Sequence, residues 1–215
     1  MSTSAEQLLK YSYTTTDKVF LQMLFCVQKL GRQTAIFILL FLRKHEKNKA
    51  WFWGHTSVVF ENCRNSNILI EGCKKDDLEQ KYYSDKKYVQ SEKIRVIAFW
   101  EKEYPQLLLQ TADFPLLLFV KGNEALLQQR SIAVVGTRKV TSYGTMVTKK
   151  LTTELVEYGY TIVSGCMYGV DALAHTQALE SQGNTIAVLG YGFGSQVPVQ
   201  AQLLQEQIIA GGGCV

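Results

Sequence analysis

The spacing of apolar residues predicts helices in the first part of the chain. The apolar positions of the first predicted helix recur three and four residues apart, as on one face of a helix. They are Phe20, Met23, Leu24, Val27 and Leu30. Asp17 is predicted to cap this helix and Gly31 to end it, and a second helix is predicted over residues 33–44. The first part of the chain is therefore expected to form a small, mainly helical module.

From residue 94 onward, short apolar runs alternate with amphipathic segments. Strands are expected over residues 95–99, 116–120, 132–135, 160–163 and 185–189. Helices are expected over residues 142–158, 170–181 and 200–210. Apolar strands that alternate with helices are typical of a parallel sheet buried on both faces. The predicted fold class is α/β, a Rossmann-like parallel sheet with flanking helices, preceded by a small helical domain.

This pattern divides the chain into three parts. Residues 1–73 are expected to form a small helical (SAM-like) domain, residues 74–93 a charged linker or helix, and residues 94–215 the Rossmann-like domain. Within the first part, Leu30-Gly31-Arg32 could be a helix-hairpin-helix-like phosphate contact, although a plain helix end is favoured. The aromatic run 51–53 could stack on bases, but a core or interface role is favoured.

Charge is unevenly distributed over the 215 residues, whose net charge is +4. Residues 1–100 carry 16 Lys and Arg against 10 Asp and Glu, and no Lys or Arg follows Lys150. The five cysteines are widely spaced, which argues against zinc and against a disulfide framework. The longest apolar run, residues 35–42, is too short to cross a bilayer, and no signal peptide is recognised. A soluble cytoplasmic protein without metal or cofactor is expected.

Candidate chemistry gathers where the predicted strands end. Function in such sheets sits at the carboxyl ends of the strands, where glycines and helix N-termini can hold a phosphate. The ends of the three strands from residue 132 onward carry small residues, hydroxyls and one arginine. The positions expected to bind phosphate are Gly136, Thr137, Arg138, Ser164 and Gly165. Neighbouring positions expected to contact the same ligand or to serve the fold are Lys139, Gly169, Asp171, His175, Gly190, Tyr191, Gly192 and Phe193.

Several of these residues have a structural alternative. Asp171 and His175 lie four apart and could form a catalytic pair, but a structural role at the start of a helix is favoured. Tyr191 and Phe193 could stack on bases or simply cover the sheet edge, and the sequence favours neither interpretation. Cys166 lacks a basic neighbour in the sequence, so an inert thiol is favoured.

Two common nucleotide-binding motifs are missing. The turn after residue 135 reads Gly136-Thr137-Arg138-Lys139 and contains no G-x-G-x-x-G, and there is no G-x-x-x-x-G-K-[ST] loop. Enzymes that use NAD or ATP are therefore disfavoured, and no catalytic residue is assigned.

The second half of the chain resembles the DprA/Smf family of DNA-processing proteins. The resemblance covers about residues 94–213 and rests on ordered motifs. They include Tyr104-Pro105, Phe114-Pro115, Lys121-Gly122, Ile132-Ala133-Val134-Val135-Gly136-Thr137-Arg138, Tyr143-Gly144, Ile162-Val163-Ser164-Gly165, Gly169-Val170-Asp171, Ala174-His175 and Thr185-Ile186-Ala187-Val188-Leu189-Gly190.

This resemblance implies an extended Rossmann domain that binds single-stranded DNA and delivers it to the RecA recombinase during natural transformation. It implies no turnover, and it implies a homodimer in the full-length family. In the family the phosphates lie over the glycine-rich strand ends, which supports the same five phosphate-binding positions. The chain departs from the family pattern at Cys166-Met167-Tyr168 and before Pro198, and its sequence stops at Val215, before the family's basic Arg-Asn-Arg stretch. A C-terminally truncated member is therefore expected.

Two further hypotheses belong to other classes. The same strand ends could hold one 5′-phosphate in a nucleoside 5′-monophosphate phosphoribohydrolase-like enzyme, although the Pro-Gly-Gly-x-Gly-Thr loop of that group is missing. The chain could also be an inactive truncated product, because a sheet that lacks its neighbouring strands leaves an exposed edge.

Overall fold

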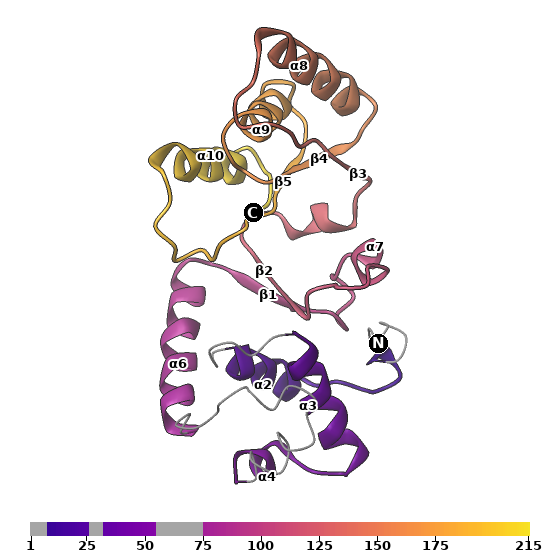
Figure 1. The fold of residues 1–215 in the computed structure, drawn as a ribbon, viewed down its shortest axis with the longest axis vertical. Coiled ribbons are helices and arrows are strands. Elements are labelled where there is room, and N and C mark those ends of the chain that lie inside the picture. The colour runs from indigo at the N-terminus through magenta and orange to yellow at the C-terminus, as the bar shows by residue number, and fades with distance from the viewer. Residues whose placement is uncertain (1–7, 26–31, 55–74) are drawn as a thin grey trace. The chain divides into compact units, whose positions relative to one another are not determined.

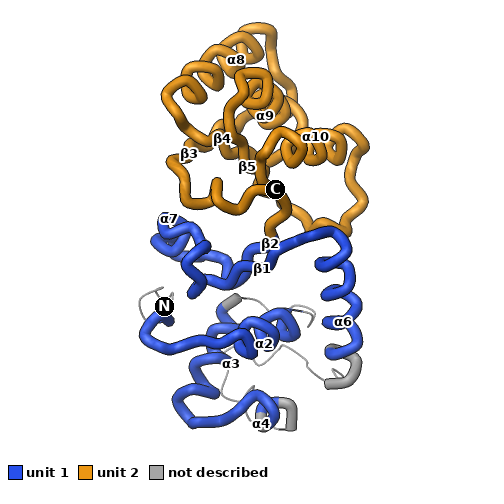
Figure 2. Tube along the Cα trace, turned by 180° about the vertical axis from the view of Figure 1, so that it is seen from behind, with its two compact units in different colours: residues 1–119 blue, residues 120–215 orange. Residues whose placement is uncertain are grey.

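The computed structural model describes residues 8–25, 32–54 and 75–215. The chain divides into two compact units, residues 1–119 and residues 120–215, which Figure 2 colours separately. The predicted division at residues 73 and 93 stays a prediction. The sequence features at residues 26–31 lie outside the described residues.

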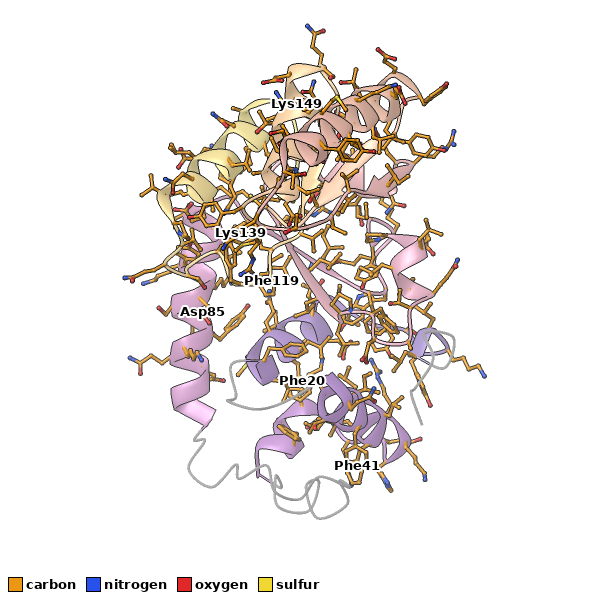
Figure 3. The ribbon with its side chains drawn as sticks, turned by 45° about the horizontal axis from the view of Figure 1, so that its top comes forward. Phe20, Phe41, Asp85, Phe119, Lys139 and Lys149 are labelled. Atoms are coloured by element: carbon orange, nitrogen blue, oxygen red, sulfur yellow. The ribbon has the colours of Figure 1, made fainter. Side chains whose placement is uncertain are left out.

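In the described part of the first unit, three helices surround an apolar core. They are α2 (Thr15–Phe25), α3 (Arg32–Lys44) and α4 (Lys49–Gly54). Phe52, from the aromatic run, is 1% exposed, and its ring meets the ring of Phe20 edge to face with the centroids 5.4 Å apart. Figure 3 shows Phe20 among these helices. The core interpretation is thus confirmed for Phe52, and α3 matches its predicted bounds to within one residue.

Helix α2 does not start at Asp17 as predicted. The backbone N–H and the hydroxyl of Thr14 donate to the Asp17 carboxylate at 2.7 and 2.8 Å, and the Asp17 N–H lies 3.4 Å from the Thr14 hydroxyl. This reciprocal pattern is a capping box, so Thr14 caps the helix and Asp17 closes the box three residues later. Arg43 and Lys49 pair with the same carboxylate at 3.1 and 3.0 Å. Burial opposes ionisation, but the bonds from Thr14 and the Lys49 charge outweigh it and lower the pKa of Asp17.

The rest of the first unit contains α6 (Lys75–Ser91), β1 (Arg95–Ala98), α7 (Gln106–Leu109) and β2 (Leu117–Val120). The charged segment predicted as linker or helix is a helix, and its Tyr82 is buried. Strands β1 and β2 form a two-stranded sheet, each one residue shorter than predicted. Beside them Tyr104 is fully buried and donates its hydroxyl hydrogen to the carbonyl of Pro115 at 2.6 Å. The two X-Pro motifs therefore meet inside this unit.

The second unit is the predicted parallel sheet. Its elements are η1 (Glu124–Gln128), β3 (Ser131–Ala133), α8 (Ser142–Glu157), β4 (Thr161–Ser164), α9 (Val170–Glu180), β5 (Thr185–Ala187) and α10 (Val199–Ala210). The strands run parallel in the order β3-β4-β5, with Ile132 opposite Ile162 and Ser164 opposite Ala187. Helices α8 and α9 pack on each other and on β4, and Figure 1 shows them together on one side of the strands. The predicted α/β fold is confirmed.

Beyond β5 the sheet is extended by short bridges. Cys214 pairs with Ile186 in parallel and with Gly122 in antiparallel sense, and the Ala187 N–H donates to the Cys214 carbonyl at 2.8 Å. Gly122 has φ +103°, and a Cβ there would lie 2.5 Å from the Gly213 carbonyl oxygen, so this position requires glycine. The outer side of β5 is therefore covered by backbone, whereas β3 lies at the edge of its sheet.

No helix of the described part of the chain has both the length and the apolar character needed to span a membrane.

Candidate functional site

Three loops meet at the carboxyl ends of the parallel strands. They follow β3 at residues 134–141, β4 at residues 165–169 and β5 at residues 188–198. The first two loops touch, since the Val170 N–H at the start of α9 donates to the Thr137 carbonyl at 3.2 Å. The structure thus brings the predicted phosphate-binding positions of β3 and β4 together. We call these three loops the strand-end rim.

Glycines make this approach of the loops feasible. Gly169 has φ +88°, and a Cβ there would overlap the carbonyl oxygen of Thr137 and lie 2.7 Å from the Cα of Arg138. At Gly136 a Cβ would lie 2.8 Å from a methyl group of Val170. At Gly165 it would lie 2.7 Å from the carboxylate of Asp171. Gly169 is therefore required where the two loops touch and Gly136 packs closely on Val170, whereas the neighbour of Gly165 is the end of a side chain that can move.

The turn after β3 presents two basic side chains to solvent. The Thr137 hydroxyl accepts from the Lys139 N–H and donates to the Lys139 carbonyl, both at 3.2 Å, which fixes the turn around Arg138. Arg138 and Lys139 are exposed, and neither forms an ion pair within residues 8–25, 32–54 or 75–215. An exposed guanidinium on such a turn can give two parallel hydrogen bonds to a phosphate.

Ser164 occupies the rim differently from the other predicted positions. Its side chain is 2% exposed, and its hydroxyl donates to the carbonyl of Val134 at 2.7 Å. The hydroxyl therefore ties the end of β4 to β3. A direct contact between Ser164 and phosphate stays a prediction.

His175 is held by the sheet and not by Asp171. Its Nδ1 lies 2.7 Å from the hydroxyl of Thr185, and that hydroxyl donates to the Ile162 carbonyl at 2.9 Å. Because the single hydroxyl hydrogen is used in this way, Nδ1–H must be the donor to Thr185. Burial lowers the pKa of His175 to about 4, against the opposing influence of Asp171. The ring is fully buried and neutral, which suits the structural role favoured for it.

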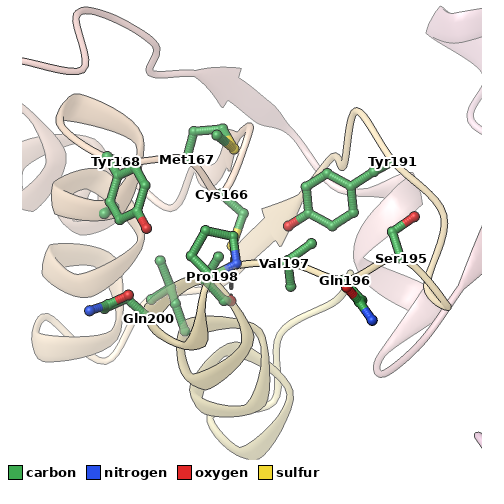
Figure 4. A pocket seen from close by; sticks show the side chains of 12 residues that line it. Cys166, Met167, Tyr168, Tyr191, Ser195, Gln196, Val197, Pro198 and Gln200 are labelled. Carbon is green, nitrogen blue, oxygen red and sulfur yellow. Dashed lines mark hydrogen bonds between the residues drawn. The ribbon is translucent and has the colours of Figure 1, made fainter.

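A cavity of about 240 Å³ opens between the loops after β4 and β5 and the start of α10. Figure 4 shows Tyr168 and Tyr191 on opposite sides of it, with Cys166 between them. No acidic or basic side chain lines this cavity. Burial, with a smaller contribution from Asp171, raises the pKa of Cys166 to about 11, so the thiol stays protonated. This agrees with the inert thiol favoured from the sequence.

The loop after β5 combines a packed and an open part. Phe193 packs against the core cluster that contains Ala187 and Leu204, whereas Tyr191 borders the cavity and accepts a hydrogen bond from Gln205 at 3.0 Å. A Cβ at Gly190 would meet nothing within 4 Å, and at Gly192 only the Ser195 hydroxyl at 4.0 Å. Phe193 thus covers the sheet, whereas Tyr191 lines the cavity.

Two features of this site were missed in the sequence. Tyr168, 45% exposed, stands on the cavity wall, and α10 begins directly after Pro198, without a side-chain cap on its first N–H groups. A proline just before a helix is a known start signal and could have moved the predicted start forward by one residue. Nothing in the sequence indicated that Tyr168 would face Tyr191, because that depends on how the two loops meet.

Among the residues that the structure describes, no cluster of three or more His, Cys, Asp or Glu side chains could hold a metal ion.

Comparison with known proteins gives a consistent result. Residues 95–215 match the family model described as DNA recombination-mediator protein A. The DNA processing protein DprA of Bacillus subtilis is 41% identical over 101 residues, which cover 46% of this chain and 34% of that protein. The protein Smf of Escherichia coli is 38% identical over 112 residues, 52% of this chain and 30% of that protein. The matched segments therefore span about a third of the length of these curated relatives.

The fold also matches a solved structure. The X-ray structure of DNA processing protein A from Streptococcus pneumoniae superposes with a TM-score of 0.66 at 27% identity, and the match covers 94% of this chain and 66% of that chain.

Proposed function

The chain belongs to the family of DNA recombination-mediator protein A, and on this premise we propose that it binds single-stranded DNA at the strand-end rim. The observation that carries the proposal is Arg138, exposed and without an ion pair among the described residues, on a turn that Thr137 and Gly169 hold in place. Phosphodiesters supply the anion that this guanidinium lacks.

The form of DNA follows from what lies beside the arginine. The cavity between Tyr168 and Tyr191 is apolar and bordered by aromatic rings, and unpaired bases stack on such rings because their faces are not covered by a second strand. A duplex would offer phosphates to Arg138 but no free base to the cavity. This combination supports single-stranded DNA over duplex DNA.

The proposal extends to delivery of the DNA to the RecA recombinase. Its support is the family description as a recombination mediator. If it is right, the chain speeds RecA-dependent ATP hydrolysis on DNA that a single-strand-binding protein already covers. An unchanged rate of ATP hydrolysis in that assay contradicts delivery but leaves the proposal of DNA binding intact. A homodimer, as the family resemblance implies, is a separate proposal that sedimentation at several concentrations tests.

The test of DNA binding is fluorescence anisotropy with a labelled oligo-dT. We expect Arg138→Ala to weaken binding at least tenfold, since a charge-assisted bond to phosphate contributes about 1.5–3 kcal/mol. Arg130→Ala is the matched control, because Arg130 precedes β3 at the other end of the strand and interacts with the Tyr160 ring. Equal affinities of the two variants would contradict the proposed site.

An assay of AMP breakdown on the same preparation distinguishes a DNA-binding protein from a nucleotide-hydrolysing enzyme. No carboxylate lines the cavity beside the rim, so AMP is expected to be recovered intact after incubation with the chain. Release of adenine above the level without protein would favour the enzyme instead.

A further inference from the structure

The excess positive charge of the chain lies in its first unit. Residues 120–215 carry six Lys and Arg and the same number of Asp and Glu, so the whole net charge of +4 belongs to residues 1–119. Four cations lie where α3 ends and α4 begins, against the single acid Glu46. They are Arg43, Lys44, Lys47 and Lys49. Basic residues gathered in this way attract a polyanion.

A groove of about 650 Å³ opens between the start of α2 and this basic segment. We call it the α2–α4 groove. Its lining is apolar at Phe20, Leu39 and Leu42, and it includes the carboxylates of Asp17 and Glu46. The residues of the groove whose side chains carry hydrogen-bond donors are Thr14, Thr16, Arg43, Lys47, Asn48 and Lys49. Cations, hydroxyls and amides are the groups that contact the phosphates of nucleic acids.

Asp17 holds two of these cations in place. Arg43 Nη2 donates to one oxygen of its carboxylate at 3.1 Å and to the Ser12 carbonyl at 2.9 Å, and Lys49 Nζ lies 3.0 Å from the other oxygen. The Asp17 side chain is 5% exposed, against 38% for Arg43 and 27% for Lys49. One buried carboxylate therefore neutralises one of two positive charges. Both cations keep N–H donors for a second anion, because a guanidinium has five and an ammonium three.

We propose that the α2–α4 groove binds phosphates of single-stranded DNA, as a contact additional to the strand-end rim. The inference rests on the proposed DNA binding for its ligand, but its residues belong to the first unit and the rim to the second. A phosphate accepts hydrogen bonds from several directions, which suits a guanidinium, an ammonium and a hydroxyl that line one space. A neutral ligand would leave the second positive charge beside Asp17 without a counter-charge.

The test places a carboxylate in the groove without weakening the helix beside it. Thr15 and Thr16 are both exposed and both lie in the first turn of α2, where an added acid interacts favourably with the helix dipole. Thr16 lines the groove, whereas Thr15 does not. Thr16→Glu should weaken binding of a long oligo-dT about tenfold and make the slope of log K against log salt concentration shallower by about 0.7. Thr15→Glu should change neither, and both variants should be at least as stable to urea as the unaltered chain.

Equal affinities and equal salt slopes for the two glutamate variants overturn the inference. They leave the rim untouched, because Arg138→Ala tests the rim separately. If Arg138→Ala has no effect while Thr16→Glu weakens binding, the groove stands and the proposed rim site fails. Combining Arg138→Ala with Thr16→Glu should weaken binding further than either change alone.

Acetylation of lysines, followed by mass spectrometry, tests the ligand of the groove directly. Long oligo-dT should slow the modification of Lys49 at least threefold but not that of Lys18, which pairs with Glu101 and has a similar side-chain exposure of 20%. Unchanged modification of Lys49 overturns the inference. Equal protection of Lys49 by inorganic phosphate alone also overturns it, because the groove then binds a free anion and not a DNA strand.

Discussion

Replacement of Gly169 by alanine tests how the strand-end rim is built. Gly169 is the N-cap of α9, with φ +88° and ψ −131°, a backbone conformation that is almost confined to glycine. The strain of placing a side chain there is about 1–3 kcal/mol. The added Cβ would also overlap the Thr137 carbonyl oxygen and lie 2.7 and 2.8 Å from the Cα and C atoms of Arg138.

These neighbours are backbone atoms, so they cannot rotate away as a flexible side chain could. Relief requires the two loops to separate, which breaks the 3.2 Å bond from the Val170 N–H to the Thr137 carbonyl, at about 1 kcal/mol. We therefore expect Gly169→Ala to lower the free energy of unfolding by about 2–4 kcal/mol, the sum of the backbone strain and the lost bond, because separation of the loops relieves the overlap. Displacement of Arg138 should also weaken binding of oligo-dT.

Gly159→Ala provides the matched control. Gly159 has φ +76°, but a Cβ there would meet nothing within 4 Å, so only the backbone strain of about 1–2 kcal/mol applies. Urea unfolding followed by circular dichroism measures both variants, with equal m-values as the sign that the two transitions can be compared. A difference between the variants below about 1 kcal/mol would refute the loop contact as the reason for glycine at this position.

Three further predictions concern buried polar groups. Burial lowers the pKa of His175 to about 4. Below pH ~6.5 the unfolded chain therefore binds a proton at this histidine, whereas the folded chain binds it only below pH ~4. Stability should thus fall by up to about 3 kcal/mol as the pH falls through this window, and His175→Gln, but not His45→Gln at an exposed histidine, should flatten that dependence in urea titrations. The Cys166 thiol, whose pKa burial raises to about 11, should resist alkylation by iodoacetamide at pH 8 and react once urea unfolds the chain; mass spectrometry showing labelling of the folded protein would contradict this. Asp17→Ala removes the carboxylate that closes the α2 capping box and pairs with two cations, and should lower the thermal midpoint through a loss of about 2 kcal/mol.

Most helices and strands followed from the sequence because local patterns specify them. The helix over 142–158 and the strand over 160–163 were each placed to within one residue, since apolar alternation and glycine turns are local signals. The start of α2 was missed because Thr14 and Asp17 are both good capping residues, and only their mutual hydrogen bonds show which one caps.

The details of the candidate site depend on contacts between segments that lie far apart in sequence. Gly169 is needed because the loop after β3, some 30 residues earlier, passes against it. His175 bonds to Thr185 on β5 and not to Asp171 one helical turn away. The exposure of β3 was also unexpected, because an apolar run predicts a buried strand but does not show whether the strand lies at the edge or in the middle of its sheet.

The salt dependence of oligo-dT binding tests the central claim, that Arg138 at the strand-end rim contacts DNA phosphate, most directly. For single strands the slope of log K against log salt concentration is about −0.7 per neutralised phosphate. The account predicts that Arg138→Ala makes this slope shallower by about 0.7 while Arg130→Ala leaves it unchanged. A slope for Arg138→Ala equal to that of the unaltered chain would contradict it.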